Sequence, residues 1–182
     1  MKNRVICLAA SAAAMVFFAA GSVRAGDVTI KGVHLCCGSC VTAVDEALTG
    51  IDGVTKPAAD RNSGIVTFKA ADAKAAEAGI KSLADAGFYG EATHDDKKTA
   101  FPDAGAKKGA KSNSITFTGV HLCCGACVKG AQAAVEKIPN ASSFDIDRNA
   151  KSITIRGSDI VVTDALAALN KAGFYGKIKK DE

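Results

Sequence analysis

A seven-residue segment occurs twice in this chain, as HLCCGSC at 34–40 and as HLCCGAC at 121–127. The two copies contain six of the chain's seven cysteines. The similarity continues well past the cysteines, because AGFYG at 86–90 returns at 172–176 at almost the same spacing. A repeat of this length predicts two copies of one structural unit, each with its own group of three thiols.

The repeats divide the chain into four parts. We expect a signal peptide at 1–25, a first domain at 26–94, a flexible linker at 95–112 and a second domain at 113–182. The first part has Lys2 and Arg4 before an apolar run and ends in small residues, which is typical of a cleavable secretory signal. The linker contains Pro, Gly, Ala and Lys without periodic apolar residues.

These features predict a secreted or periplasmic protein. Cys7 leaves with the signal, so the mature chain has six cysteines. No other stretch approaches the length of about 20 apolar residues that a membrane span needs, so we expect no membrane insertion after signal cleavage. Removing three basic residues with the signal changes the formal charge from +4 to +1 and gives no reason to expect nucleic-acid binding. The two domains carry weakly opposite charges, which would favour docking between them or reflect ordinary surface variation.

Apolar periodicity predicts the same order of elements in both copies. In the first, Val28 and Ile30 alternate with polar residues as in a strand, and helical spacing begins at Val41, which places Cys40 at the helix entrance. Two further strands, a helix over roughly 73–86 and a short last strand follow. In the second copy Thr163 is the expected N-cap of the last helix. The order βαββαβ predicts an α+β protein of two tandem ferredoxin-like domains, each an antiparallel sheet with two helices on one face.

The chain resembles the heavy-metal-associated domain family, which includes copper chaperones and the periplasmic mercury-binding protein. Gly32-Val33, Cys37 and Cys40, and the helix residues Val41, Val44 and Leu48 match the family's opening motif and first helix. Ala86-Gly87-Phe88 matches its Ala-Gly-aromatic turn, and in the family that aromatic lies near the metal loop. The departure is in the loop, where two residues are added before Cys37 and Cys36 is an additional thiol. The resemblance implies a soft-metal binding protein of ferredoxin-like fold.

The cysteines of both copies are the candidate metal ligands: Cys36, Cys37, Cys40, Cys123, Cys124 and Cys127. Thiolates select soft ions over Mg²⁺ or Ca²⁺, and a helix N-terminus favours the thiolate form of cysteine. We expect Cu(I) as the bound ion, with Zn(II) or Hg(II) as alternatives. Whether Cys36 and Cys124 join their neighbours as third ligands is left open, since adjacent side chains in extended backbone point to opposite sides.

Four further residues near the thiols are candidates for additional ligands or for supporting the site: His34, His121, Phe88 and Phe174. Neutral imidazole is a common metal ligand, but these histidines can equally lie at strand ends without a role. The aromatic residues can pack in the core and also shield a metal–thiolate site from water.

The sequence therefore favours an exported binder or carrier over an enzyme. We expect a Cu(I) chaperone or buffer, exchanging metal with a thiol-rich donor or acceptor protein. The alternatives are a thiol–disulfide redox protein, a Hg(II) or Zn(II) scavenger, and cysteines that close structural disulfides. Against redox chemistry, none of the three prolines lies where a thioredoxin-like fold needs one. Against structural disulfides, clustered cysteines close only very short loops.

Overall fold

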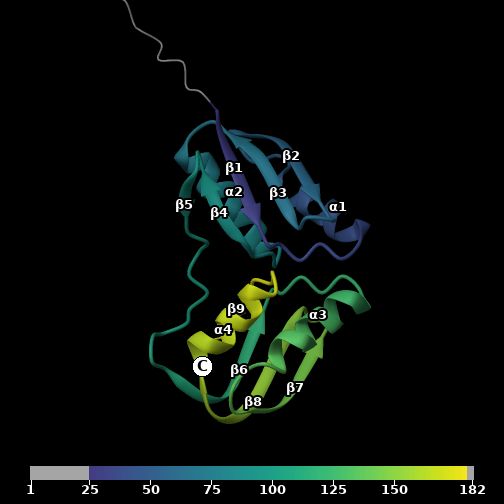
Figure 1. Cartoon of the computed structure of the whole chain (residues 1–182), viewed down its shortest axis with the longest axis vertical. Helices are drawn as coiled ribbons and strands as arrows, with labels where there is room; N and C mark the ends of the chain where they lie inside the picture. Colours follow the sequence, from purple (N-terminus) through teal and green to yellow (C-terminus); the bar gives the residue numbers. More distant parts are fainter. Residues whose placement is uncertain (1–24, 180–182) are drawn as a thin grey trace, which may run out of the picture.

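The structure is a computed structural model that describes residues 25–179. It consists of two halves, repeat 1 and repeat 2, which face each other across a narrow interface (Figure 1). The predicted signal peptide at 1–25 lies outside the described residues except for Ala25. Among the described residues, no helix combines the length and apolar character needed to cross a membrane.

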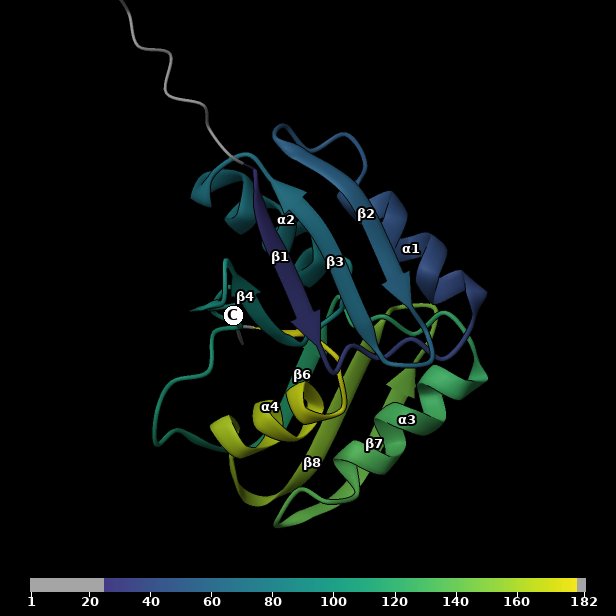
Figure 2. The same cartoon turned by 45° about the horizontal axis from the view of Figure 1, so that its top comes forward.

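Repeat 1 comprises two helices and five strands. In chain order these are β1 (Gly26–Lys31), α1 (Gly38–Leu48), β2 (Val54–Asp60), β3 (Ile65–Ala70), α2 (Ala73–Asp85), β4 (Glu91–His94) and β5 (Lys97–Thr99). The strands form one sheet in the order β2-β3-β1-β4-β5, and every neighbouring pair is antiparallel. Both helices lie on the same face of this sheet (Figure 2).

Repeat 2 has the same organisation. Its elements are β6 (Lys111–Thr118), α3 (Gly125–Val135), β7 (Ala141–Asp147), β8 (Ser152–Val161), α4 (Val162–Lys171) and β9 (Lys177–Ile178). The sheet order is β7-β8-β6-β9, which corresponds strand by strand to β2-β3-β1-β4 of repeat 1. A βαββαβ chain in this order is a ferredoxin-like fold. The predicted fold class, two tandem ferredoxin-like α+β domains, is confirmed.

Alternating side chains of the central strands form the core of each repeat. Val28 and Ile30 of β1 are buried, as are Ile115 and Phe117 at the equivalent positions of β6. They point to the face that the helices cover, where Leu83 of α2 is also buried. Each such side chain contributes about 1.5–3 kcal/mol when it leaves water. This burial fixes the register of the central strand and therefore the position of the loop that follows it.

The segment 95–112, predicted as a flexible linker, is more ordered than its composition indicates. β5 pairs with β4, and β6 begins within the segment at Lys111. Between them, Phe101 packs near Tyr89 of repeat 1, with ring centroids 4.8 Å apart, and the hydroxyl of Tyr175 donates to the carbonyl of Pro102 at 3.2 Å. Backbone pairing and two tyrosines therefore hold this segment. Neither kind of contact requires periodic apolar residues within 95–112, so the composition of the segment did not indicate them.

Two details of the helix starts differ from the sequence expectations. α1 begins at Gly38, ahead of the expected Val41, so Cys37 is its N-cap and Cys40 lies in its first turn. The expected N-cap Thr163 is wrong, because β8 continues directly into α4 and Val161 occupies the cap position. Hydrogen bonding of β8 to β6 as far as Val161 leaves no turn in which Thr163 could cap the helix.

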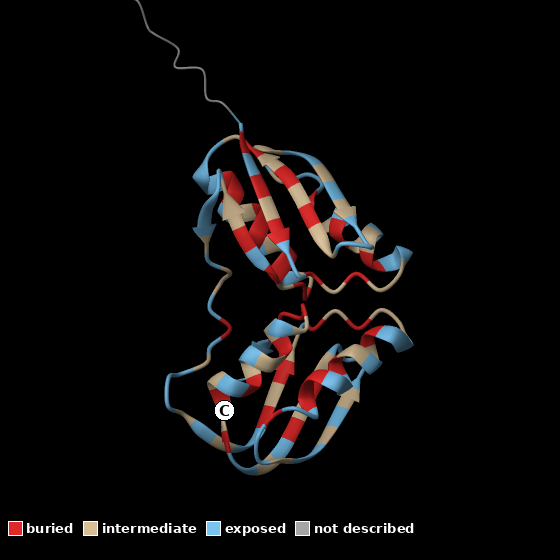
Figure 3. Cartoon of the chain, in the orientation of Figure 1, coloured by how far each residue is buried: buried red, intermediate tan, exposed pale blue. Residues whose placement is uncertain are grey.

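The two repeats dock through their AGFYG segments. Phe88 and Phe174 form an antiparallel bridge, in which the amide of Tyr89 donates to the carbonyl of Gly173 at 3.1 Å. The amide of Tyr175 donates to the carbonyl of Gly87 at 2.9 Å. The loops that precede α1 and α3 lie opposite each other beside this bridge, and both contain buried residues (Figure 3). Equivalent segments thus meet about an approximate two-fold axis.

Candidate metal centre

The loop after each central strand is held against its own domain, which aims its cysteines at the other repeat. In repeat 1 the amide of Val33 donates to the carbonyl of Gly64 at 2.9 Å, and the side chains of Val33 and Leu35 are buried. In extended backbone, alternate side chains point to opposite sides. Cys36 therefore points away from the core when Leu35 points into it. Val120 and Leu122 are buried in the same way before Cys123.

This geometry brings the sulfurs of all six cysteines of the described residues together between the repeats. We call this group the thiol cluster: Cys36, Cys37, Cys40, Cys123, Cys124 and Cys127. Across the interface the sulfur–sulfur distances are Cys36–Cys127 3.4 Å, Cys36–Cys124 3.5 Å, Cys40–Cys123 3.6 Å, Cys37–Cys123 3.7 Å and Cys40–Cys127 3.9 Å. Within the repeats they are Cys36–Cys40 3.7 Å, Cys37–Cys40 3.8 Å and Cys123–Cys127 3.5 Å.

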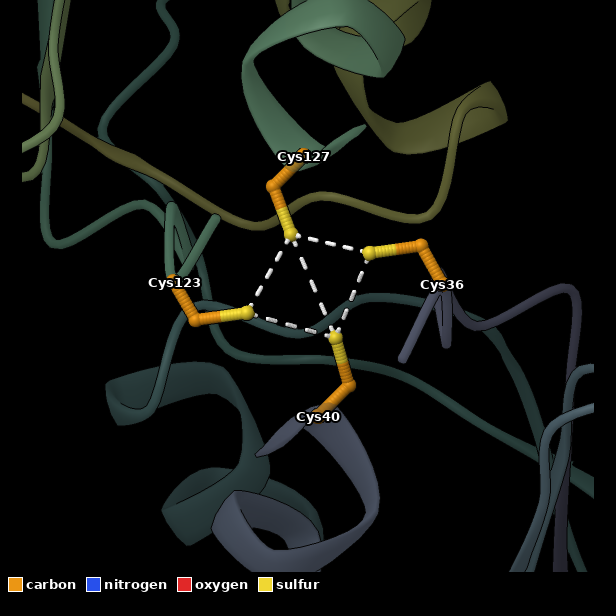
Figure 4. A group of neighbouring side chains, drawn as sticks. All are labelled: Cys36, Cys40, Cys123 and Cys127. Atoms are coloured by element: carbon orange, nitrogen blue, oxygen red, sulfur yellow. Dashed lines mark hydrogen bonds between the residues drawn. The ribbon is translucent and has the colours of Figure 1, made fainter. Parts of the chain in front are cut away.

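Four of these sulfurs form the centre of the cluster. Cys36 and Cys40 point from repeat 1, and Cys123 and Cys127 point from repeat 2, toward a common point (Figure 4). These four sulfur atoms all lie within 4.8 Å of one another. Cys40 and Cys127 are buried, whereas the other two are partly exposed. All distances are far longer than a disulfide bond of about 2.05 Å, so the six residues are thiols.

Cys37 and Cys124 form the outer part of the cluster at the N-terminal ends of α1 and α3. The backbone N–H of Cys40, helped by the neighbouring thiols and by the N–H of Ser39, outweighs burial and lowers the pKa of Cys37 to about 6. The backbone N–H of Cys127 is the main cause of a lowered pKa at Cys124. Unpaired N–H groups at a helix start favour a negative charge there. These two sulfurs therefore carry the thiolate character predicted from the sequence.

The inner sulfurs behave in the opposite way. Burial is the first cause of a raised pKa at both Cys36 and Cys123, and hydrogen bonds to the surrounding thiols raise it further. The pKa of Cys127 is also raised, again mainly by burial. Several sulfurs in contact cannot all be negatively charged unless a cation lies between them. The cluster has the chemistry of a cation site made only of soft ligands.

The four other candidate residues lie beside the cluster and pair across the interface. His34 stacks on Phe174 with ring centroids 4.4 Å apart, and Phe88 stacks on His121 at 4.2 Å. The Nε2 atoms of both histidines are buried without a hydrogen-bond partner. Burial lowers the pKa of His34, and burial with the charge of Lys151 lowers that of His121 to about 4. Neither histidine belongs to the groups of potential ligand atoms found among the described residues.

Two glycines allow the loops to approach this closely. A Cβ atom at Gly87 would lie 2.2 Å from the backbone nitrogen of His121, and one at Gly173 would lie 2.4 Å from that of His34. Both glycines also have positive φ angles, of 87° and 85°. Any other residue there would separate the repeats or distort the backbone. Sequence reasoning assigned these glycines only to a turn, although their identical recurrence beside Phe88 and Phe174 was a signal of a second role.

The structure also shows which residues of the two repeats contact each other, which the sequence did not specify. The docking that the sequence allowed between the two domains is present, and one of its contacts is an ion pair between Asp85 of α2 and Lys177 of β9, with nitrogen and oxygen 2.7 Å apart. The two groups of three thiols, which the sequence predicted as one in each repeat, thus form one continuous group of sulfurs. No pattern within a single repeat could have revealed this, because it depends on how the two repeats pack.

Comparisons with known proteins give distant structural likenesses. No family model matches the chain, and no curated protein matches it. The chain is similar to oxidized MerP from Ralstonia metallidurans CH34, at 19% identity over 39% of this chain and 100% of the other, with a TM-score of 0.35. It is similar to the N-terminal soluble domains of Bacillus subtilis CopA at 15% identity, over 84% of this chain and 92% of the other, with a TM-score of 0.32.

A third likeness is to a structure from work on crosstalk between Cu(I) and Zn(II) homeostasis. It has 15% identity and a TM-score of 0.33, and it covers 37% of this chain and 100% of the other. Likeness at this level adds nothing to the geometry of the thiol cluster. The resemblance to the heavy-metal-associated domain family therefore continues to rest on its motifs, and the ferredoxin-like fold rests on the strand order.

Proposed function

We propose that this protein is an exported soft-metal carrier that binds Cu(I) through the CCxxC thiolates of its two repeats. The observation that carries the proposal is the convergence of six cysteine sulfurs, at 3.4–3.9 Å from their neighbours, without a disulfide among residues 25–179. A role in binding explains why both repeats keep the same three cysteines at the face where they meet.

The ligand set favours a soft ion. The potential ligand groups found among the described residues contain only cysteine sulfur, and such ligands select Cu(I), Zn(II) and similar ions over hard cations. Cu(I) is favoured over Zn(II) because a structural zinc site is complete with four ligands, whereas the cluster offers six sulfurs. Zn(II) or Hg(II) bound at the inner four sulfurs is the alternative that the titration below distinguishes.

Transfer of the metal would use the outer sulfurs. Cys37 and Cys124 are partly exposed and lie next to the exposed residues 38–39 and 125–126. A thiolate of a partner protein can approach from this side, bind the ion together with one of these sulfurs, and take over as the original bonds break. The partner would be a thiol-rich metal donor or acceptor. Export of the carrier follows from the signal-like residues 1–25, so that exchange would take place in the periplasm or outside the cell.

The experiment that tests this function is an anaerobic titration of the reduced mature protein with Cu(I), Zn(II) and Hg(II), each against a competing chelator. We expect the protein to retain Cu(I) against chelators that remove Zn(II) from it. Substitution of all six cysteines by serine should abolish metal uptake. Ser39→Ala is the matched control, because it removes an exposed oxygen beside the cysteines and leaves the sulfurs in place. Absence of uptake of every soft ion would contradict the function, and disulfide reductase turnover without metal would favour the redox alternative.

A further inference from the structure

The sulfur–sulfur distances within the thiol cluster fit a distorted octahedron. Cys40 has as neighbours, at 3.6–3.9 Å, the sulfurs of Cys36, Cys37, Cys123 and Cys127. Cys36 and Cys123 both have the sulfurs of Cys40 and Cys127 as neighbours, at 3.4–3.7 Å, and both lie within 4.8 Å of the sulfurs of Cys37 and Cys124. No dashed line joins Cys36 and Cys123 in Figure 4. They lie within 4.8 Å of each other. Two atoms that share the same ring of neighbours without touching occupy opposite corners of an octahedron.

A single metal ion does not fit this arrangement of six sulfurs. An ion at the centre of an octahedron with edges of about 3.6 Å would have six bonds of about 2.6 Å, longer than the metal–thiolate bond of about 2.3 Å. It would also leave six thiolates facing one or two positive charges. An ion held by the four inner sulfurs would leave Cys37 and Cys124 without a role, although both lie within 4.8 Å of Cys36 and Cys123.

The triangular faces of the octahedron fit three-coordinate ions. An ion at the centre of three sulfurs, with bonds of about 2.3 Å, holds those sulfurs about 4.0 Å apart. The triangle of Cys36, Cys40 and Cys127 has sides of 3.7, 3.4 and 3.9 Å. The triangle of Cys37, Cys40 and Cys123 has sides of 3.8, 3.7 and 3.6 Å. Expansion by a few tenths of an ångström would seat a trigonal ion in either face.

From this geometry we propose that the two repeats together hold one cluster of about four Cu(I) ions, one on each alternate face of the sulfur octahedron, with every thiolate bridging two ions. The proposal rests on the carrier function above and specifies how its cargo is held. Copper remains Cu(I) throughout, so no electron is transferred. The cysteines that are still protonated release their protons to solvent, and six thiolates with four Cu(I) carry a net charge of −2, compared with −5 for a single ion.

Such a cluster requires both repeats. In either set of alternate faces, three of the four triangles contain sulfurs from both halves of the chain, as Cys36 and Cys40 do with Cys127. The two repeats are held together without metal–sulfur bonds, because the AGFYG segments pair and the histidines stack on the aromatic rings. The octahedron is therefore preformed, and the first ion would order the sulfurs for the next. Binding should be cooperative.

The test is an anaerobic Cu(I) titration of the full mature chain, followed by X-ray absorption and luminescence measurements. We expect cooperative saturation at about four Cu(I) per chain, three-coordinate copper with a copper–copper scattering path, and the emission typical of copper–thiolate clusters in a monomer by gel filtration. Saturation at two ions, with two-sulfur coordination and no copper–copper path, would overturn the cluster while leaving the carrier function intact. Absence of any uptake would overturn both.

A wedge in the interface tests whether both repeats are needed. Gly130 lies in α3, where a Cβ atom would lie 2.7 Å from Cε1 of His34. Its helical backbone accepts other residues, so Gly130→Leu should force the repeats apart without straining repeat 2. Lys129→Leu is the matched control, because residue 129 is exposed on the same helix. The wedge should reduce capacity to about two ions and remove the luminescence, whereas the control should keep both.

Circular dichroism of the wedge variant measures whether the chain keeps its helix and strand content, and small-angle X-ray scattering measures whether the repeats are open. A folded wedge variant with open repeats that still binds about four luminescent ions would overturn the shared cluster. The copper–copper path of the unmodified protein tests the proposal independently of this variant, so a wedge variant that does not fold leaves a decisive measurement in place.

Discussion

Repeat 1 and repeat 2 place equivalent residues against each other where they meet and differ away from that face. The stacks His34–Phe174 and His121–Phe88 have centroid distances of 4.4 and 4.2 Å, and Gly173 and Gly87 allow the same close approach on the two sides. In contrast, within residues 25–179 only repeat 1 has a fifth strand, β5. The comparison indicates that the shared face is constrained on both sides by one structure, the thiol cluster, while the outer edges are free to diverge.

Charged residues are the exception to this equivalence at the face where the repeats meet. Asp85 and Lys177 form an ion pair across the interface. The residues at the equivalent positions are Lys171 and Glu91, which have the opposite signs and line the same surface hollow. The interface thus keeps its charge complementarity in both directions although the individual charges are exchanged. Each of the following predictions breaks or sharpens this symmetry, beginning with the largest effect.

Gly173→Ala should have the largest effect on the docking of the repeats. Its Cβ would lie 2.4 Å from the His34 nitrogen, and the clash should cost about 1–3 kcal/mol. Gly119→Ala is the matched control, because Gly119 has a similar positive φ of 75° but open space around it. Both variants bear backbone strain of about 1–2 kcal/mol. Small-angle X-ray scattering should show open repeats only in Gly173→Ala, and equal compactness of the two variants would contradict the docked interface.

Cys36→Ser should lower Cu(I) affinity about 100-fold, which corresponds to about 2.7 kcal/mol, because a hydroxyl is a poor ligand for a soft ion. Cys123→Ser occupies the equivalent corner of the cluster and should have an effect of the same size. Competition with a Cu(I) chelator measures both. An unchanged affinity in Cys36→Ser, with a large loss in Cys37→Ser, would indicate a two-sulfur site in each repeat.

His34→Ala should destabilise the closed protein by about 1 kcal/mol through loss of its stack on Phe174. His121→Ala removes the equivalent stack on Phe88 and should act similarly. Urea unfolding of the metal-free protein measures each change, and the double variant should lose about the sum, since the two stacks share no side chain. If instead either variant lost Cu(I) coordination by X-ray absorption, the histidine would be a ligand, as the sequence left open.

Lys177→Ala should have the smallest effect, at most about 1 kcal/mol, because its pair with Asp85 is largely exposed. Burial acts to raise the pKa of Asp85, but Lys177 and Lys81 outweigh it and hold the pKa below the ordinary value of 3.8. The pair therefore contributes stability above pH 3.8 and loses it as the pH falls through the lower folded-state pKa. Urea unfolding at several pH values measures this, with the exposed Lys179→Ala as control, and added salt should remove the difference.

The sequence predicted the fold well because its signals are local. Alternation at Val28 and Ile30 and the repeated order of elements were enough to specify each ferredoxin-like domain. The cysteines were identified as candidate ligands for the same reason. The sequence did not specify whether the two thiol groups join, because their joining depends on backbone contacts between residues as far apart as Gly87 and Tyr175. The order in segment 95–112 could not be predicted from its composition, since it depends on Tyr89 and Tyr175 in other parts of the chain.

The segment Phe101–Asp103 has a consequence for a cell that makes little of this protein. It joins the two halves in one polypeptide and contacts a tyrosine of each. A site shared by separate subunits would come apart as their abundance falls, whereas the linked halves meet at an effective concentration set by the connection alone. The capacity to collect metal would then be the same in a scarce protein as in an abundant one.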